Sequence, residues 1–463
     1  MASSLLGIVA AVMCGQAWSG PVLPASDVEA IVARAVNDDA ARLASARGLR
    51  PGRPFTVRVL DRAHMAAERE AAERGARAPA VIAAEARMLA LMGLEAGDSP
   101  GPGEPVPGAA VVDLTGFYDP ASKRIYVGNW VALTSDRAAR LKDAAEAVLD
   151  RRFGLAERQT SRHGPEQDAS EGEGDALWAR IALFEGDATV QTLERLSPDG
   201  AMPPTRRLAG EMYEVRKTFE SEGEADNHGG AALDLARRAF VILDGTSFVA
   251  RVRARAPWSA VNQLWERLPV STEQLLHPDK YERREVPDDV AARWPIRKGQ
   301  GAPRGEVVYS DTLGELGARA FLERTVGPYR AERAATGWGG DRVRLIRGPE
   351  GEDGVAPEFV AWLTTWDGVS DAQDFAEQAG LALASLARAP LAEVADARRR
   401  RPRGGAREPR RWRGVDAAGR AFDVEWREAA VVILVGAPPA AERALPALVA
   451  AATARRPGRS RSR

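Results

Sequence analysis

A stripe of apolar side chains near residue 145 restricts the possible folds of this chain more than any other feature. The stripe lies between about residues 136 and 157, at Leu141, Ala145, Val148, Leu149 and Phe153. Spacings of three and four residues place these side chains on one face of an α-helix, and such a face is stable only where another element covers it. The sequence therefore predicts a helix that lies inside a folded body.

Helical and strand patterns alternate along the rest of the chain. Helical patterns cover about residues 26–47, 62–93, 175–195, 230–255, 258–266 and 370–388. Strand patterns fall at Phe55–Leu60, Val111–Leu114, Arg124–Val127, Phe359–Trp366 and Ala430–Val435. This order favours an α+β fold, with a strand-containing N-terminal region, a helical centre and a small C-terminal α+β unit.

The length of 463 residues allows about three domains or one large composite body. The segment 97–108 is rich in glycine and proline, which favours a flexible connector. We expect a signal peptide at 1–19, an N-terminal α+β region at 26–130, a helical core at 131–350, a C-terminal α+β unit at 355–450 and a basic tail at 451–463.

The charge balance excludes a globally basic nucleic-acid-binding protein, because 64 cationic residues face 65 acidic ones. Arginine is nevertheless dense at Arg398–Arg413 and at Arg455–Arg463. Such stretches could hold nucleic acid or an acidic surface, or they could be solvated segments of an arginine-biased chain. We favour solvated segments, because Trp412 is the one aromatic residue among these arginines. No nucleic-acid partner is expected.

The N-terminus is typical of an export signal. Leu5–Cys14 is an apolar run too short to span a bilayer, and Ala17 to Ser19 follow it with the small residues that signal peptidase prefers. The alternative is a buried N-terminal helix. Cleavage before about Gly20 would remove the one cysteine, and no later segment reaches the roughly 18 apolar residues of a membrane helix. We expect a secreted or periplasmic protein without a transmembrane span after cleavage.

Several segments of the chain resemble a family of secreted bacterial proteins related to zinc metallopeptidases, with a zincin-like helical core. Any one segment is a weak signal, whereas all of them in the family's order are specific. The resemblance extends from about residue 50 to 440 and is carried by Gly116–Pro120, Lys123–Tyr126, Leu141–Leu155, Phe184–Thr189, Pro269–Pro278 with Tyr281, and Gly337–Asp341.

The resemblance implies a His-Glu-x-x-His motif on the helix that contains the apolar stripe, with a glutamate from a later helix as the third zinc ligand. The motif positions here hold Lys142, Asp143, Ala144, Ala145 and Glu146, so both histidines are absent. Glu185 remains at the third-ligand position. An ammonium cannot ligate zinc, and carboxylates alone do not select it. We therefore expect that the zinc site is lost, and we assign no metal, cofactor or catalytic residue.

His277 also matches a family position, where it would lie near the former cleft or serve as a structural histidine. The degenerate positions and Glu185 predict that the Lys142 ammonium replaces the metal charge between Glu146 and Glu185. For that, the helix at 138–155 must pack against the helix that carries Glu185.

These features favour a catalytically inactive metallopeptidase homologue that acts as a binding or scaffolding protein for a protein or peptide ligand. One alternative is a peptidase-like hydrolase with a carboxylate-only site, in which Asp143, Glu146 and Glu185 hold Ca²⁺ or Mg²⁺ or act as an acid–base pair without metal. Another is a structural envelope protein whose cleft has collapsed.

Overall fold

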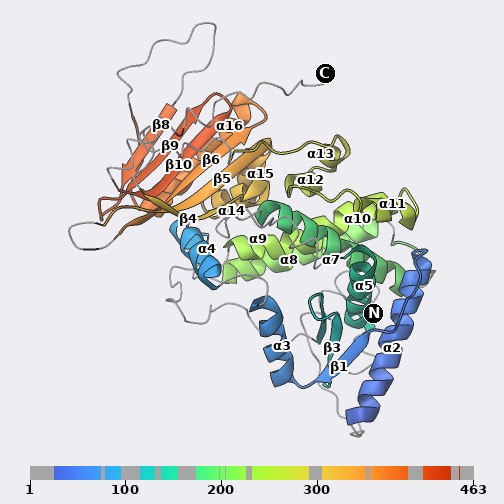
Figure 1. Cartoon of the computed structure of the whole chain (residues 1–463). Coiled ribbons are helices and arrows are strands. Elements are labelled where there is room, and N and C mark those ends of the chain that lie inside the picture. The colour runs from blue at the N-terminus through green and yellow to red at the C-terminus, as the bar shows by residue number, and fades with distance from the viewer. Residues whose placement is uncertain are drawn as a thin grey trace.

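The computed structural model is an α+β protein, which confirms the predicted fold class (Figure 1). It describes residues 25–74, 79–94, 115–130, 137–154, 174–197, 199–203, 205–225, 232–290, 305–350, 354, 356–394, 410–438 and 448. The predicted signal peptide, the connector at 97–108, the strand at 111–114 and the basic tail lie outside these residues. Among the described helices, none combines the length and the apolarity that crossing a membrane requires.

The N-terminal region contains a three-stranded sheet in the order β1-β3-β2. Its strands are β1 (Thr56–Leu60), β2 (Gly116–Asp119) and β3 (Arg124–Gly128). β3 pairs parallel with β1 and antiparallel with β2. Helices α2 (Ala25–Ala46) and α3 (Arg62–Arg74) pack against this sheet.

The helical pattern predicted over 62–93 corresponds to α3 and to α4 (Pro79–Leu91), which lie in different parts of the molecule. α4 packs on strands of the C-terminal sheet, where Met88 is fully buried (Figure 1). The predicted N-terminal region at 26–130 therefore includes a helix that belongs spatially to the C-terminal part. The apolar residues of α4 lie on most sides of the helix. Their spacing therefore indicates that the helix is buried, but it does not indicate which other element covers it.

The centre of the molecule is helical. Its elements are α5 (Arg137–Phe153), α7 (Gly174–Leu196), α8 (Thr205–Ala225), α9 (Ala232–Ala239), the π-helical turn η1 (Phe240–Asp244), α10 (Gly245–Arg253), α11 (Trp258–Leu264), α12 (Glu273–Leu276) and α13 (Pro278–Glu282). Two glycines let α7 and α10 approach closely. A Cβ on Gly245 would lie 2.1 Å from the carbonyl oxygen of Ala182, and one on Gly186 would lie 2.2 Å from the backbone of Gly245.

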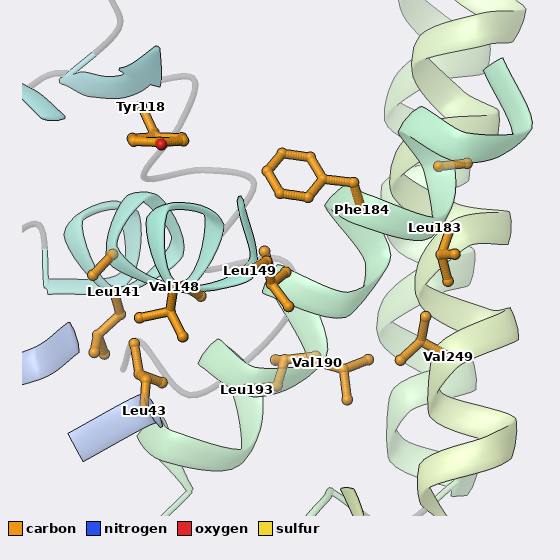
Figure 2. Packing of buried hydrophobic residues seen from close by; sticks show 14 of the residues in the cluster. Leu43, Tyr118, Leu141, Val148, Leu149, Leu183, Phe184, Val190, Leu193 and Val249 are labelled. Carbon is orange, nitrogen blue, oxygen red and sulfur yellow. The ribbon is translucent and has the colours of Figure 1, made fainter. Parts of the chain in front are cut away.

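The predicted packing of the central helix is confirmed, because α5 lies against α7 and α2. Leu141 and Leu149 are fully buried on the striped face, and they share one core with Leu193 of α7 and Leu43 of α2 (Figure 2). This packing fixes α5 and α7 side by side, and with them the positions of Lys142 and Glu185.

The C-terminal part is a seven-stranded antiparallel sheet in the order β4-β5-β6-β10-β9-β8-β7. Its strands are β4 (Glu306–Asp311), β5 (Trp338–Arg347), β6 (Glu358–Trp366), β7 (Ala392–Glu393), β8 (Arg410–Val415), β9 (Ala421–Arg427) and β10 (Ala430–Ala437). α14 (Gly314–Val326), α15 (Pro328–Ala335) and α16 (Val369–Ala387) contribute to the core on one face of this sheet.

The predicted boundary between the helical core at 131–350 and the C-terminal unit at 355–450 falls inside this sheet. β5 pairs with β6 in an antiparallel register that extends from Trp338 to Arg347, so the predicted boundary separates two neighbouring strands of one sheet. The C-terminal part therefore begins at β4 and is larger than the small unit that the sequence suggested.

Candidate functional site

Lys142 lies between two carboxylates from two helices. Its Nζ is 2.5 Å from Oε2 of Glu185 on α7, and it also donates to Oε1 of Glu146 one turn further along α5. The side chains of Lys142, Glu146 and Glu185 are 19%, 8% and 25% exposed, so the cluster is mostly shielded from water. The predicted juxtaposition of these three degenerate motif positions is confirmed.

The electrostatics of this cluster keep the lysine charged. Burial alone would lower the pKa of the Lys142 ammonium, but Glu146 and Glu185 outweigh burial and raise that pKa above its usual value. Burial raises the pKa of the Glu146 carboxyl to about 7, Glu185 adds to the rise, and Lys142 and Arg69 oppose it. The Lys142 side chain thus supplies the positive charge between the two carboxylates.

Asp143, one of the degenerate motif positions, is buried beside β2. The backbone there approaches so closely that a Cβ on Gly116 would lie 2.9 Å from Oδ2 of Asp143 and 2.6 Å from the carbonyl oxygen of Tyr126. Only a glycine fits this gap without displacement. The backbone at the start of the Gly-Phe-Tyr-Asp-Pro segment therefore packs directly against the Asp143 carboxylate.

His277 belongs to a different cluster. Its Nε2 lies 2.8 Å from Oε1 of Glu315, a buried residue in the first turn of α14. The hydrogen bond to Glu315 raises the pKa of the His277 imidazole, while partial burial opposes the rise. The bond partner of the imidazole is thus a side-chain carboxylate, and the two interpretations of His277, as a residue near the former cleft or as a structural histidine, stay predictions.

A second lysine, Lys280 of α13, also lies among carboxylates, which sequence reasoning missed. Its Nζ lies 2.5 Å from Glu273, 2.6 Å from Asp367 and 2.8 Å from Glu285. In the part of the chain that the structure describes, this acidic triad is the one group of three or more histidine, cysteine, aspartate or glutamate residues whose ligand atoms all lie within 4.8 Å of one another, as the ligands of a metal ion do. Lysine is rare in this chain, and Lys280 lies within the Pro269–Tyr281 segment that contributes to the family resemblance. These two features were the signal in the sequence that could have singled out Lys280.

Asp187 is a further residue that the sequence did not single out, although it lies two residues after Glu185. It forms a fully buried ion pair with Arg47, whose Nη2 is 2.6 Å from Oδ2 of Asp187. Trp265 donates its indole N–H to the same oxygen at 2.7 Å, and Arg47 stacks over Trp258. These contacts join α7 to the residues that directly follow α2 and α11.

The Gly337–Asp341 segment has a structural role. Trp338 is fully buried, and Gly337 adopts a φ of 86° that favours glycine. Asp341 accepts hydrogen bonds from the backbone N–H groups of Leu313 and Gly314 at the start of α14. The carboxylate thus satisfies N–H groups that the helix itself leaves without partners.

Comparison with known proteins gives one match. A family model for a domain of unknown function (DUF8575) matches residues 304–446, which span the seven-stranded sheet and helices α14 to α16. No curated protein and no solved structure matches the chain. The match includes neither α5 nor α7, so it leaves the Lys142 cluster without a described counterpart.

Proposed function

We propose that this chain is a non-catalytic homologue of the secreted zinc-metallopeptidase-like proteins and that it binds a protein or peptide ligand outside the cytoplasm. The observation that carries the proposal is the Lys142 ammonium between Glu146 and Glu185. These residues occupy the positions where the family resemblance requires two metal ligands and the third ligand. The helices and their packing are retained while the metal-binding chemistry is replaced.

The residues present do not fit zinc. Zinc sites use imidazole, thiolate and carboxylate ligands, and catalytic ones commonly combine two histidines with a glutamate. Here a cationic side chain with a raised pKa lies within 2.5 Å of the remaining glutamate. A metal ion at the same place would face a fixed positive charge, and both would compete for the same carboxylate oxygens. We derive no catalytic step through zinc.

A carboxylate-only hydrolase is the second candidate, and the raised pKa of Glu146 favours it. A carboxyl that titrates at about 7 suits general acid–base chemistry at neutral pH, and Glu185 is exposed enough to meet a substrate. The ion pairs argue against this candidate, because both carboxylates are already engaged by Lys142. Peptidase activity without added metal would support it.

The metal content and peptidase activity of the purified protein test the proposal. We expect substoichiometric zinc after dialysis against a zinc buffer, and no peptide hydrolysis above background. The variant Lys142→His/Asp143→Glu/Glu146→His restores the ligand set and should bind about one zinc per chain. The matched control is Lys142→His alone, which leaves only one imidazole. Stoichiometric zinc in the parent protein would overturn the proposal.

The place of action is part of the same proposal and rests on the predicted signal peptide at 1–19. Mass spectrometry of the protein isolated from its native cells should give an N-terminus near Gly20. An intact Met1 or a lipid on Cys14 would contradict export by cleavage at this site.

A further inference from the structure

Three buried aspartates meet where the helical centre joins the C-terminal sheet. Asp175 lies in the first turn of α7, Asp311 ends β4, and Asp341 lies in β5. Each is at most 3% exposed. Asp175 belongs to the helical centre, whereas Asp311 and Asp341 belong to neighbouring strands of the C-terminal sheet. We call this cluster of three aspartates the joint, and it forms only when the two parts of the molecule are in contact.

Each aspartate accepts hydrogen bonds from the start of a helix on another segment. Asp311 accepts from the N–H of Gly174 at the start of α7, at 2.7 Å. Asp175 accepts from the N–H and hydroxyl of Thr272, before α12, at 3.1 and 2.6 Å. Asp341 caps α14 through Gly314. These bonds join α7 to β4, the start of α12 to α7, and α14 to β5.

Gly314 shows how closely the carboxylates approach. A Cβ at this position would lie 1.8 Å from Oδ1 of Asp175, while the Gly314 N–H donates to Asp341 at 2.9 Å. The two carboxylates therefore lie on either side of one glycine. Asp311 lies on the same side of α7, because its bond partner Gly174 directly precedes Asp175 in the chain.

One oxygen in this joint is left without a partner. Among the described residues, none hydrogen-bonds Oδ2 of Asp175, although that atom is buried. A buried ionised carboxylate with an unsatisfied oxygen beside two others is costly, whereas a protonated one has no charge to solvate. The geometry thus disfavours three simultaneous negative charges.

We propose that Asp175 takes up a proton when the helical centre docks on the C-terminal sheet, so that the joint is tightest in mildly acidic surroundings and opens more readily as the pH rises to neutral. The joint is a conformational device and does not depend on the proposed binding function. Burial, together with Asp341 and Asp311, raises the pKa of Asp175 to about 7, which is consistent with this role.

The charged groups around the joint do not displace the proton from Asp175. Burial raises the pKa of Asp341, and Arg342 opposes that rise only in part, while burial and Glu85 together raise the pKa of Asp311. On the turn that carries Thr272, Glu273 is paired with Lys280, and His277 is paired with Glu315. Asp175 itself is hydrogen-bonded by Thr272 and not by any of these cations.

The test is peptide-resolved hydrogen exchange of the full chain between pH 5 and 8, corrected for the intrinsic exchange rate at each pH. Asp175 binds a proton in the closed joint and, with an ordinary pKa, not in the open one. Opening measured at Thr272 and Gly314 should therefore rise about tenfold per pH unit between pH 5 and 6.5 and level off above 7. Leu149 of α5 reports global unfolding and serves as the reference.

Asp175→Asn is the decisive variant, because the amide can still accept the Thr272 bonds but carries no titrating proton. It should remove most of the pH dependence at Thr272. An unchanged slope in this variant, or no slope in the parent protein, would overturn the proposal. If the variant does not fold, a carboxyl ¹³C titration of the parent decides, since a pKa of Asp175 below about 5 would equally refute it.

Discussion

Lys142 of α5 and Glu185 of α7 meet at 2.5 Å, although 43 positions separate them, and their ion pair crosses the contact between the two central helices. Glu146 completes the cluster from the lysine's own helix. In this arrangement the cation belongs to the chain itself and cannot dissociate. The stability of the arrangement should therefore depend on the lysine and not on any ion in solution.

Replacing Lys142 by Met should destabilise the protein by about 3 kcal/mol, because both ion pairs are lost and the shielded Glu146 must either face Glu185 without a counter-charge or take up a proton. The measurement is the free energy of unfolding in urea at pH 7.5. Lys217→Met on α8 is the matched control, since Lys217 is exposed and should change stability by less than about 0.5 kcal/mol. An equally small loss for Lys142→Met would mean that the cluster is effectively solvated.

The stability of the parent protein should fall as the pH rises from 5 to 8. Burial raises the pKa values of Asp341, Glu146 and Glu273 to about 6, 7 and 8. An acid with a raised pKa holds its proton in the folded state and loses it on unfolding, so the unfolded state binds fewer protons in this window. His277, whose pKa is also raised, acts in the same direction.

We expect the free energy of unfolding to be at least about 2 kcal/mol lower at pH 8 than at pH 5, measured by urea titration at constant ionic strength. Carboxyls whose pKa is lowered, such as that of Glu358, titrate below this window and do not cancel the effect. A stability maximum near pH 8 would show that these buried acids ionise without penalty.

The features of the fold and of the site that depend on periodicity and motif spacing could be predicted from the sequence. The α5 stripe, its packing on α7 and the Lys142 cluster all follow from positions three, four or seven residues apart and from the family resemblance. The sequence could not predict which surface α4 covers, because its apolar pattern has little sidedness. The partners of Asp187 and Lys280 could not be predicted from the sequence either. Arg47 and Asp367 are distant from these residues in the chain and meet them only through tertiary packing.

The Arg47–Asp187 pair should be among the most sensitive positions in the molecule. Both side chains are fully buried, so Arg47→Met leaves the Asp187 carboxylate with Trp265 but no cation, and we expect a loss of about 3–5 kcal/mol. The double variant Arg47→Met/Asp187→Leu removes both charges and should recover part of that loss. Thermal unfolding of both variants checks this, and a double variant worse than the single one would contradict it.

Lys280→Met should turn a lysine-filled carboxylate cluster into a site for a hard cation. The oxygens of Glu273, Glu285 and Asp367 lie within 4.8 Å of one another, a separation that Ca²⁺ can bridge with oxygen ligands at about 2.3–2.6 Å. In the parent protein the ammonium already occupies the position where these oxygens converge, so Ca²⁺ should leave its melting temperature unchanged.

In the variant, Ca²⁺ at 5 mM should raise the melting temperature by several degrees, because an ion that binds only the folded state stabilises it by mass action. The control is Lys280→Met/Asp367→Asn, which removes one ligand and should lose most of the response. Since Asp367 follows β6 and Glu273 lies in α12, a calcium response would also show that a cation at this point fastens the helical centre to the C-terminal sheet. A variant that is indifferent to calcium would mean that the three carboxylates separate once the lysine is gone.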